Sequence, residues 1–211
     1  MCRDDSNPGV VLTLPILARM KPIEGWLDED EADLLIATCS KVVLTCPDSC
    51  ALVEVGSYCG RSTVVLGSVI QAMGSKAHVY AIDPHEGTVG AEGDSTRVTF
   101  PTLARCESNL AAAGLGDTVT IIAQRSFEVQ WDRPISVLFI DGLHDFNNVA
   151  RDFQHFEPYL VAGGYAVFHD YGNQYTGVTA FVDDLMASRF YRRIACVRST
   201  MVLQKRSTPT G

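Results

Sequence analysis

The chain has 211 residues, of which 46% are hydrophobic and 20% charged, and its formal net charge at pH 7 is −8. This composition is typical of one soluble globular domain and excludes a disordered or fibrous chain. The acidic balance disfavours nucleic acid and anionic membranes as partners. No run of about 18 apolar residues and no secretory signal pattern occurs, so we expect a cytoplasmic protein.

The first predicted elements are helical. Residues 1–27 are interpreted as an N-terminal arm, and residues 28–211 as a single domain. Asp28 and the acids that follow it favour the start of a helix over 28–45, which Pro47 ends.

Five short apolar runs follow, and most are separated by helical patterns. Runs that are almost wholly apolar predict strands buried on both faces, and their alternation with helices predicts parallel βαβ units. The strands are expected at 51–55, 77–82, 118–123, 135–140 and 165–168, and the helices at 61–73, 99–113, 146–160 and 176–189. Two further runs, 191–197 and 201–205, predict an antiparallel hairpin.

The segment 84–98 has neither periodicity and contains several charges and glycines. A loop of this length is typical of a lid or of a disordered segment, and the sequence leaves both open.

Ligands of open parallel sheets bind beyond the carboxyl ends of the strands. The first strand runs into an E-x-G-x-x-x-G pattern, made by Glu54, Gly56 and Gly60, and the second ends at Asp83. An acid at that position is placed to accept both hydroxyls of a ribose, but the loop lacks the dinucleotide fingerprint. The combination favours S-adenosylmethionine over NAD. In the alternative interpretation, the glycines make a tight turn and Asp83 is a surface residue.

The motif GSYCGRS at 56–62 resembles the first cofactor loop of catechol O-methyltransferases. The segments IDGLH at 140–144 and GGYAVFHD at 163–170 resemble the macrolide-sugar and cephalosporin-biosynthesis methyltransferases. The wider pattern, over residues 22–205, is similar to class I S-adenosylmethionine-dependent methyltransferases of the small-molecule O-methyltransferase type. The expected fold is an α/β, Rossmann-like sheet of seven strands, mostly parallel with one antiparallel strand, with helices on both faces and an N-terminal helical extension.

The resemblance also implies roles for individual residues. Glu54 and Gly56 border the methionine half of the cofactor, Tyr58 and Ser62 lie near its carboxylate, Asp83 holds the ribose, and Ser126 lies by the adenine. Ser57 and Gly60 complete the cofactor loop, and Asp141 contacts the cofactor amino group or a metal. His144 occupies the position of the catalytic base, with Asp141 beside it.

A divalent metal is expected at Asp141 and Asp170, which end neighbouring strands. Carboxylates at the ends of two neighbouring strands repel each other unless one is protonated or a cation lies between them. Oxygen ligands of this kind suit Mg²⁺. The third ligand is left open: Tyr171 stands where the catechol enzymes have an Asn, and His169 where the sugar enzymes have an acid. Because successive strand residues point to opposite faces, His169 and Asp170 need not share a site. A metal-free variant also stays open.

The predicted function is methyl transfer from S-adenosylmethionine to a hydroxyl of a small molecule, which is the expected partner; a homo-oligomer is also possible. His144 would take the proton, although a surface histidine paired with Asp145 is the alternative. The alternative functions are a metal-dependent hydrolase that uses the two His-Asp pairs and a non-catalytic, cofactor-binding partner subunit. Trp26 is interpreted as a packing residue.

Overall fold

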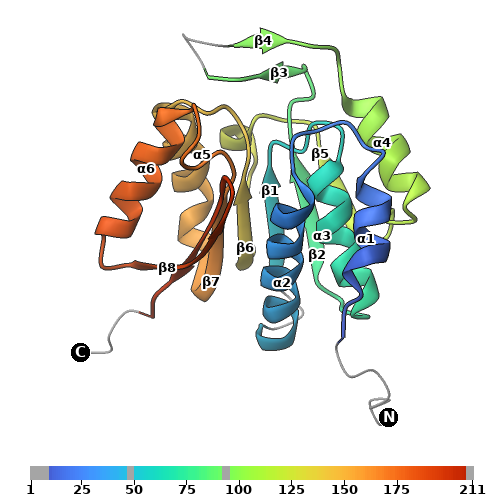
Figure 1. The fold of residues 1–211 in the computed structure, drawn as a ribbon, viewed down its shortest axis with the longest axis horizontal. Coiled ribbons are helices and arrows are strands. Elements are labelled where there is room, and N and C mark those ends of the chain that lie inside the picture. The colour runs from blue at the N-terminus through green and yellow to red at the C-terminus, as the bar shows by residue number, and fades with distance from the viewer. Residues whose placement is uncertain (1–9, 47–49, 92–95, 208–211) are drawn as a thin grey trace.

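The computed structural model describes residues 10–46, 50–91 and 96–207. A seven-stranded sheet forms the centre, in the order β5-β2-β1-β6-β7-β9-β8 (Figure 1). All pairings from β5 to β7 are parallel, whereas β9 is antiparallel to both of its neighbours. The predicted mostly parallel sheet with one antiparallel strand is therefore confirmed.

The strands of this sheet lie close to their predicted positions. Their bounds are β1 Ala51–Val55, β2 His78–Ile82, β5 Val119–Ile122, β6 Ile135–Ile140, β7 Leu160–Phe168, β8 Tyr191–Val197 and β9 Thr200–Lys205. Only β7 differs much, because it begins five residues before its predicted start. Gly163 and Gly164 lie inside it and interrupt the apolar pattern from which strands are predicted.

The helices are α1 Thr13–Met20, α2 Glu29–Thr45, α3 Arg61–Ala72, α4 Leu103–Ala112, α5 Phe146–Phe156 and α6 Thr176–Ala187. Asp28 precedes α2 as its N-cap residue, as predicted. The predicted helix over 99–113 begins later, at Leu103, because the backbone N–H of Thr99 donates to the carbonyl of Gly87 instead. The helix over 146–160 ends at Phe156 and continues as a single 3₁₀ turn that contains Pro158. None of the described helices is long and apolar enough to cross a membrane.

Helices cover both faces of the sheet, which confirms the predicted layers. Alternate residues of each buried strand face opposite cores. Leu52 packs with α1, α2, α3 and α4, whereas Val53 packs with α5 and α6. The N-terminal helix α1 is part of the first core, since Ile16, Leu17 and Met20 are buried there.

The segment 84–98 contains a short antiparallel ribbon, formed by β3 (Thr88–Val89) and β4 (Arg97–Val98). Two-residue strands are too short to give an alternating pattern, so the sequence predicted only a loop. Figure 1 shows the ribbon above the edge of the sheet, beyond the carboxyl end of β2. The ribbon is therefore positioned over the part of the sheet where ligands of this fold bind.

Candidate active site

A cavity of about 870 Å³ lies beyond the carboxyl ends of the parallel strands. It opens where the chain order of the strands reverses, between β1 and β6. Eight predicted site residues line it: Gly56, Tyr58, Asp83, Ser126, Asp141, His144, His169 and Asp170. The volume lies near the upper end of the range for small-molecule sites, of about 300–1,000 Å³, which suits two ligands side by side.

The loop after β1 approaches the loop after β6 so closely that only glycine fits at Gly56. A Cβ added there would lie 2.0 Å from the carbonyl oxygen of Asp141, and φ is +93°. Gly60, with φ +85°, precedes α3 and leaves its first amides free to face a ligand. Gly56 thus lets the backbone itself form part of the wall of the cavity.

Asp83 orders the cofactor loop from the end of β2. Its carboxylate accepts the backbone N–H of Tyr58 at 2.8 Å and that of His85 at 2.6 Å. Each carboxylate oxygen has a second lone pair, so Asp83 can still accept hydroxyl groups. The ribose contact of Asp83 stays a prediction, and it requires this remaining capacity to accept.

Four predicted cofactor residues lie behind this wall and do not line the cavity: Glu54, Ser57, Gly60 and Ser62. The Thr63 hydroxyl donates to the buried Glu54 carboxylate at 2.5 Å. Glu54 Oε1 and Ser57 Oγ are buried without a hydrogen-bond partner among the described residues. Buried polar atoms without a partner are rare in proteins, and these two lie at the start of the loop.

Burial raises the pKa of Glu54 to about 7; hydrogen bonds from Ser62 and Thr63 oppose this effect, and the charges of Asp141 and Asp83 add to it. The pKa of Glu54 is higher in the folded protein than in the unfolded chain. The contribution of Glu54 to the free energy of unfolding is therefore greatest below pH 4.5 and is lost as the pH rises through 7. The difference between the folded and the unfolded pKa of Glu54 corresponds to about 3 kcal/mol in the free energy of unfolding.

We therefore expect Glu54→Gln to become more stable relative to wild type as the pH rises from 4.5 to 8, by about 3 kcal/mol. Urea unfolding of both proteins across this range measures the difference. Glu107→Gln, at an exposed glutamate of α4, is the matched control and should show no such trend. A Glu54→Gln difference that is constant with pH would contradict the assignment.

Ser126 also lines the cavity, and the resemblance places the adenine beside it. Its hydroxyl donates to the Asp152 carboxylate, and burial raises the pKa of Asp152 to about 6. Beside them, the Arg151 guanidinium lies 4.1 Å from the centre of the Phe127 ring. A flat aromatic side chain next to a buried acceptor suits a purine.

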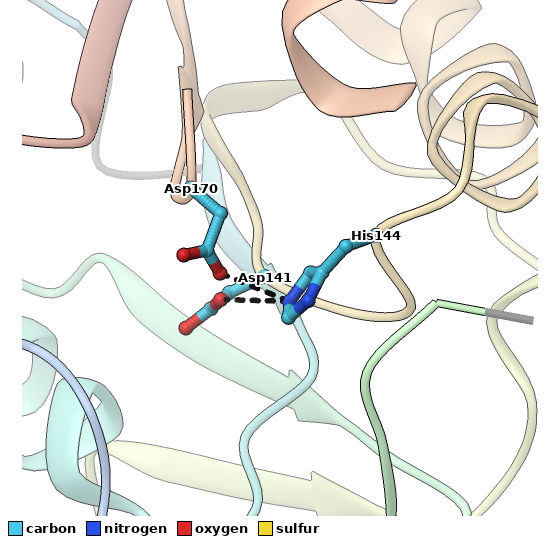
Figure 2. Close-up of side chains that lie close together, drawn as sticks. All are labelled: Asp141, His144 and Asp170. Carbon is cyan, nitrogen blue, oxygen red and sulfur yellow. Dashed lines mark ion pairs between the residues drawn. The ribbon is translucent and has the colours of Figure 1, made fainter. Parts of the chain in front are cut away.

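Asp141, His144 and Asp170 also line the cavity, and their side chains lie close together (Figure 2). His144 Nε2 lies 3.0 Å from Asp170 Oδ2 and 3.9 Å from Asp141 Oδ1. His144 Nδ1 is buried and has no hydrogen-bond partner among the described residues. The imidazole is thus held by carboxylates through one nitrogen, while the other lacks a partner.

His169 and Asp170 do share this site, a point that strand alternation left open. Asp170 has a φ of +63°, so the chain leaves the strand conformation at this residue, and its carboxylate turns toward Asp141 and His144. His169 Nδ1 lies 3.3 Å from Asp141 Oδ1 and 3.2 Å from Asp170 Oδ2. Asp is one of the few non-glycine residues that adopt this backbone readily, and residues in sparsely populated conformations cluster at functional sites.

The other nitrogen of His169 contacts an acid that the sequence did not associate with the site. Nε2 lies 3.2 Å from Oε2 of Glu31, which is 2% exposed. Burial alone would raise the pKa of Glu31, but the hydrogen bond from His169 and the backbone N–H of Asp28 lower it to about 2. Burial also opposes the charged form of Asp141. The interaction with His169 favours this form, and the pKa of Asp141 falls to about 2. The carboxylates of Asp141, Asp170 and Glu31 in turn raise the pKa of His169, against the effect of its burial.

A metal can be placed at one group only within the part of the chain that the structure describes: Asp141, His144 and Asp170, whose ligand atoms lie within 4.8 Å of one another. Both predicted aspartates belong to it, and Nδ1 of the possible ligand His169 lies 3.3 Å from Asp141 Oδ1 and 3.2 Å from Asp170 Oδ2. The group fits Mg²⁺ poorly. It contains a nitrogen where Mg²⁺ prefers oxygen, and Asp170 accepts hydrogen bonds at Oδ1 from Asn173 and at Oδ2 from His169. Tyr171 turns away and donates to Asp183.

Sequence reasoning missed several residues of the cavity, including Glu31, Asp152, Tyr175 and Trp26. Trp26 is not the packing residue that was predicted, since 54% of it is exposed. The Tyr175 ring lies 4.2 Å from the His144 ring, between centres. Of these four residues, only Trp26 lies in a sequence motif, the one that precedes the first long helix. A comparison of that motif with the family could have assigned Trp26 to the site.

The model of a family described as "Methyltransferase domain" matches residues 53–171, more than half of the chain. Among solved structures, the O-methyltransferase NovP is similar, with a TM-score of 0.72, 16% sequence identity, and coverage of 87% of this chain and 84% of that one. CalS11, described as a TDP-rhamnose 3'-O-methyltransferase of calicheamicin biosynthesis, is also similar. Its TM-score is 0.62 and its sequence identity 14%, and the match covers 91% of this chain and 92% of that one. For an O-methyltransferase from Bacillus cereus in complex with SAH, the TM-score is 0.59 and the sequence identity 16%. This match covers 92% of this chain and 90% of that one.

At these identities the solved structures show a shared fold, whereas the family model shows membership. The match begins inside β1 and ends just after Asp170, so it contains the cofactor loop, Asp83 and the Asp141–His144–Asp170 group. The chain belongs to the methyltransferase-domain family, which confirms the class I S-adenosylmethionine-dependent methyltransferase predicted from its glycine loop.

Proposed function

We propose that the protein transfers the methyl group of S-adenosylmethionine to a hydroxyl of a small molecule. The observation that carries this proposal is the placement of His144 and Asp170 in the same cavity as the cofactor loop. The similar structures whose titles describe O-methyltransferases, one of them acting on a sugar, support oxygen as the acceptor atom.

The cofactor fits the end of the cavity formed by Gly56, Asp83 and Ser126. Asp83 would hold the ribose hydroxyls, Ser126 and Asp152 the adenine, and the loop amides the carboxylate. The cavity wall also contains more acids than arginines, which suits a sulfonium cation: Asp28, Glu31, Asp83, Glu86, Asp141, Asp152 and Asp170 against Arg97, Arg125, Arg151 and Arg198.

A bound S-adenosylmethionine supplies the methyl group, whose bond to sulfur breaks as the bond to the acceptor oxygen forms, leaving S-adenosylhomocysteine. Nε2 of His144, which lies 3.0 Å from Asp170 Oδ2, is the ring nitrogen beside the acids of the cavity. His144 takes the proton of the acceptor hydroxyl, and Asp170 stabilises the imidazolium that results. The rate depends on how well the walls hold oxygen and methyl in line.

The acceptor would enter beside Trp26, Tyr175 and the β3–β4 ribbon, which line the mouth of the cavity. The ribbon would then close over it and exclude water. Two aromatic side chains beside a polar end are typical of sites for a ring that carries a hydroxyl, in a sugar, a phenol or a polyketide.

Formation of S-adenosylhomocysteine should depend on an added hydroxyl compound. The assay uses three acceptor classes, namely sugars, phenols and polyketide alcohols, and a parallel reaction contains phosphoesters without S-adenosylmethionine. Acceptor-dependent formation of S-adenosylhomocysteine supports the proposal. Phosphoester hydrolysis would support the metal-dependent hydrolase instead, and cofactor binding with no turnover in any class would indicate a non-catalytic subunit.

A further inference from the structure

Arginines line the cavity at four positions, and at three of them the guanidinium is engaged with a neighbouring side chain. These partners are Glu86 for Arg125, Asp28 and Asp30 for Arg198, and Asn148 and the Phe127 ring for Arg151. The fourth arginine, Arg97, forms no side-chain ion pair or hydrogen bond within the described part of the chain. Its guanidinium carbon lies 6.0 Å from the centre of the Trp26 ring. The N–H groups of Arg97 are therefore available to a ligand.

The acids of the cavity wall are all engaged elsewhere and leave Arg97 without a counter-charge among the described residues. Their partners are Arg198 for Asp28, Ser199 for Glu31, two backbone N–H groups for Asp83, Arg125 for Glu86, Ser126 for Asp152, and His144 for Asp141 and Asp170. Arg97 is thus a local positive charge in a wall that is otherwise acidic.

The β3–β4 ribbon positions Arg97 close along the chain to the loop that carries His144. Arg97 of β4 lies opposite Val89 of β3. The next residue, Gly90, accepts the backbone N–H of His144 at 2.9 Å. The neighbouring Val98 is 70% exposed, so strand alternation directs Arg97 to the other face of the ribbon, toward the cavity.

The Trp26 ring beside Arg97 is held from the cofactor side. Arg61, the first residue of α3, donates from Nε to the carbonyl of Leu27 at 2.8 Å and from Nη1 to that of Ile23 at 2.7 Å. The Trp26 ring also lies 5.1 Å from the Tyr58 ring, between centres. A guanidinium that contacts the face of a fixed ring keeps the N–H groups of its edge for a hydrogen-bonding partner.

From this geometry we infer that the acceptor carries an anionic group, a carboxylate or a phosphate, besides the hydroxyl that is methylated, and that Arg97 binds this group. A planar guanidinium binds such anions through two parallel N–H···O bonds. Arg97 is thereby a specificity-determining residue, and Trp26 supports it. The inference rests on the proposed function, which it deepens.

The first test compares the kcat/KM of acceptors that differ in one anionic group. The pairs are 3,4-dihydroxybenzoate with catechol, glucuronate with glucose, and glucose 6-phosphate with glucose, so that a carboxylate and a phosphate are tested separately. In at least one pair we expect the anionic member to be favoured by about 10–100-fold, the contribution of hydrogen bonds between charged groups. Equal values within every pair would overturn the inference and leave the proposed function intact.

The second test replaces the arginine. Arg97→Met should reduce the preference to about one by raising the KM for the anionic acceptor, whereas Arg97→Lys keeps the charge but not the planar donors and should retain part of it. Arg189→Met, at an exposed residue just beyond the end of α6 that is distant from Tyr175, is the matched control and should retain the full preference. A preference that survives Arg97→Met would contradict the role of Arg97.

The third test does not depend on turnover. Calorimetric titration of the same compounds into the complex with S-adenosylhomocysteine should give a Kd at least about tenfold lower for an anionic member than for its neutral partner, and equal values in Arg97→Met. If no anionic member binds the wild type more tightly than its partner, the inference is overturned, whether or not methyl transfer occurs. Binding that depends on Arg97 without turnover of any compound would contradict the proposed function and support the anion site.

The carboxylate of the cofactor is the other anion that Arg97 could bind, and the same calorimeter distinguishes it. We expect the Kd of S-adenosylmethionine to change by less than about twofold in Arg97→Met. A loss of about tenfold or more would assign Arg97 to the cofactor carboxylate and overturn the inference.

Discussion

Replacing His144 with alanine is expected to lower kcat by about 10²–10⁴-fold, the usual contribution of a general base. The ring that is lost contacts Asp141, Asp170 and Tyr175 and no residue of the loop between β1 and α3. The Kd for the cofactor should therefore change little. Steady-state kinetics with a saturating acceptor, together with calorimetric titration of the cofactor, separates the two quantities.

A histidine far from the cavity is the matched control. His78, at the start of β2, contacts Thr120 at the opposite end of the strands, and His78→Ala should leave kcat unchanged. If His144→Ala retained the wild-type kcat, His144 would not be the base. Its pairing with Asp170 would then be structural only.

Replacing Asp83 with alanine is expected to weaken S-adenosylmethionine binding by about 100-fold, since hydrogen bonds to a charged acceptor contribute about 1.5–3 kcal/mol each. The variant loses the carboxylate that we propose as the acceptor of the ribose hydroxyls. It also loses the bonds to the backbone N–H groups of Tyr58 and His85, which order the loop. Calorimetric titration measures the change in Kd.

Asp117→Ala, at an exposed turn residue, is the control and should bind the cofactor as the wild type does. The far-ultraviolet circular dichroism of Asp83→Ala shows whether the fold survives. An Asp83→Ala variant that is folded and binds the cofactor with wild-type affinity would place the ribose elsewhere.

The fold could be predicted because its signals are local. The strands of the parallel sheet are short apolar runs, buried on both faces, and β1, β2 and β6 lie within a residue of their predicted bounds. The final hairpin was also visible, since its two runs flank a three-residue turn. Gly56 and Asp83 could be found because each directly follows a strand, and the ends of neighbouring parallel strands meet at one edge of the sheet.

The part of the site that sequence could not predict depends on distant contacts. Glu31 and His169 are 138 residues apart, and nothing in either neighbourhood indicates that they meet. The sign of the backbone dihedral at Asp170 is a second example. Strand alternation would direct the side chain of Asp170 away from that of His169. The left-handed backbone at Asp170 reverses this direction. This reversal brings the imidazole and both aspartates together, and it changes the expected metal site.

The short ribbon β3–β4 was missed for a different reason. Each of its strands has two residues, and the pairing of Thr88 with Val98 depends on the position of the whole segment over the sheet. Burial of Asp152 was missed as well, because α5 is polar enough that its one buried acid gives no pattern.

The most direct test of oxygen methylation is nuclear magnetic resonance of the product formed from S-adenosylmethionine labelled with ¹³C in its methyl group. With an acceptor found in the turnover assay, the labelled carbon should be bonded to an oxygen of the acceptor, in a yield equal to the S-adenosylhomocysteine formed. A labelled carbon bonded to nitrogen, sulfur or carbon would contradict transfer to a hydroxyl.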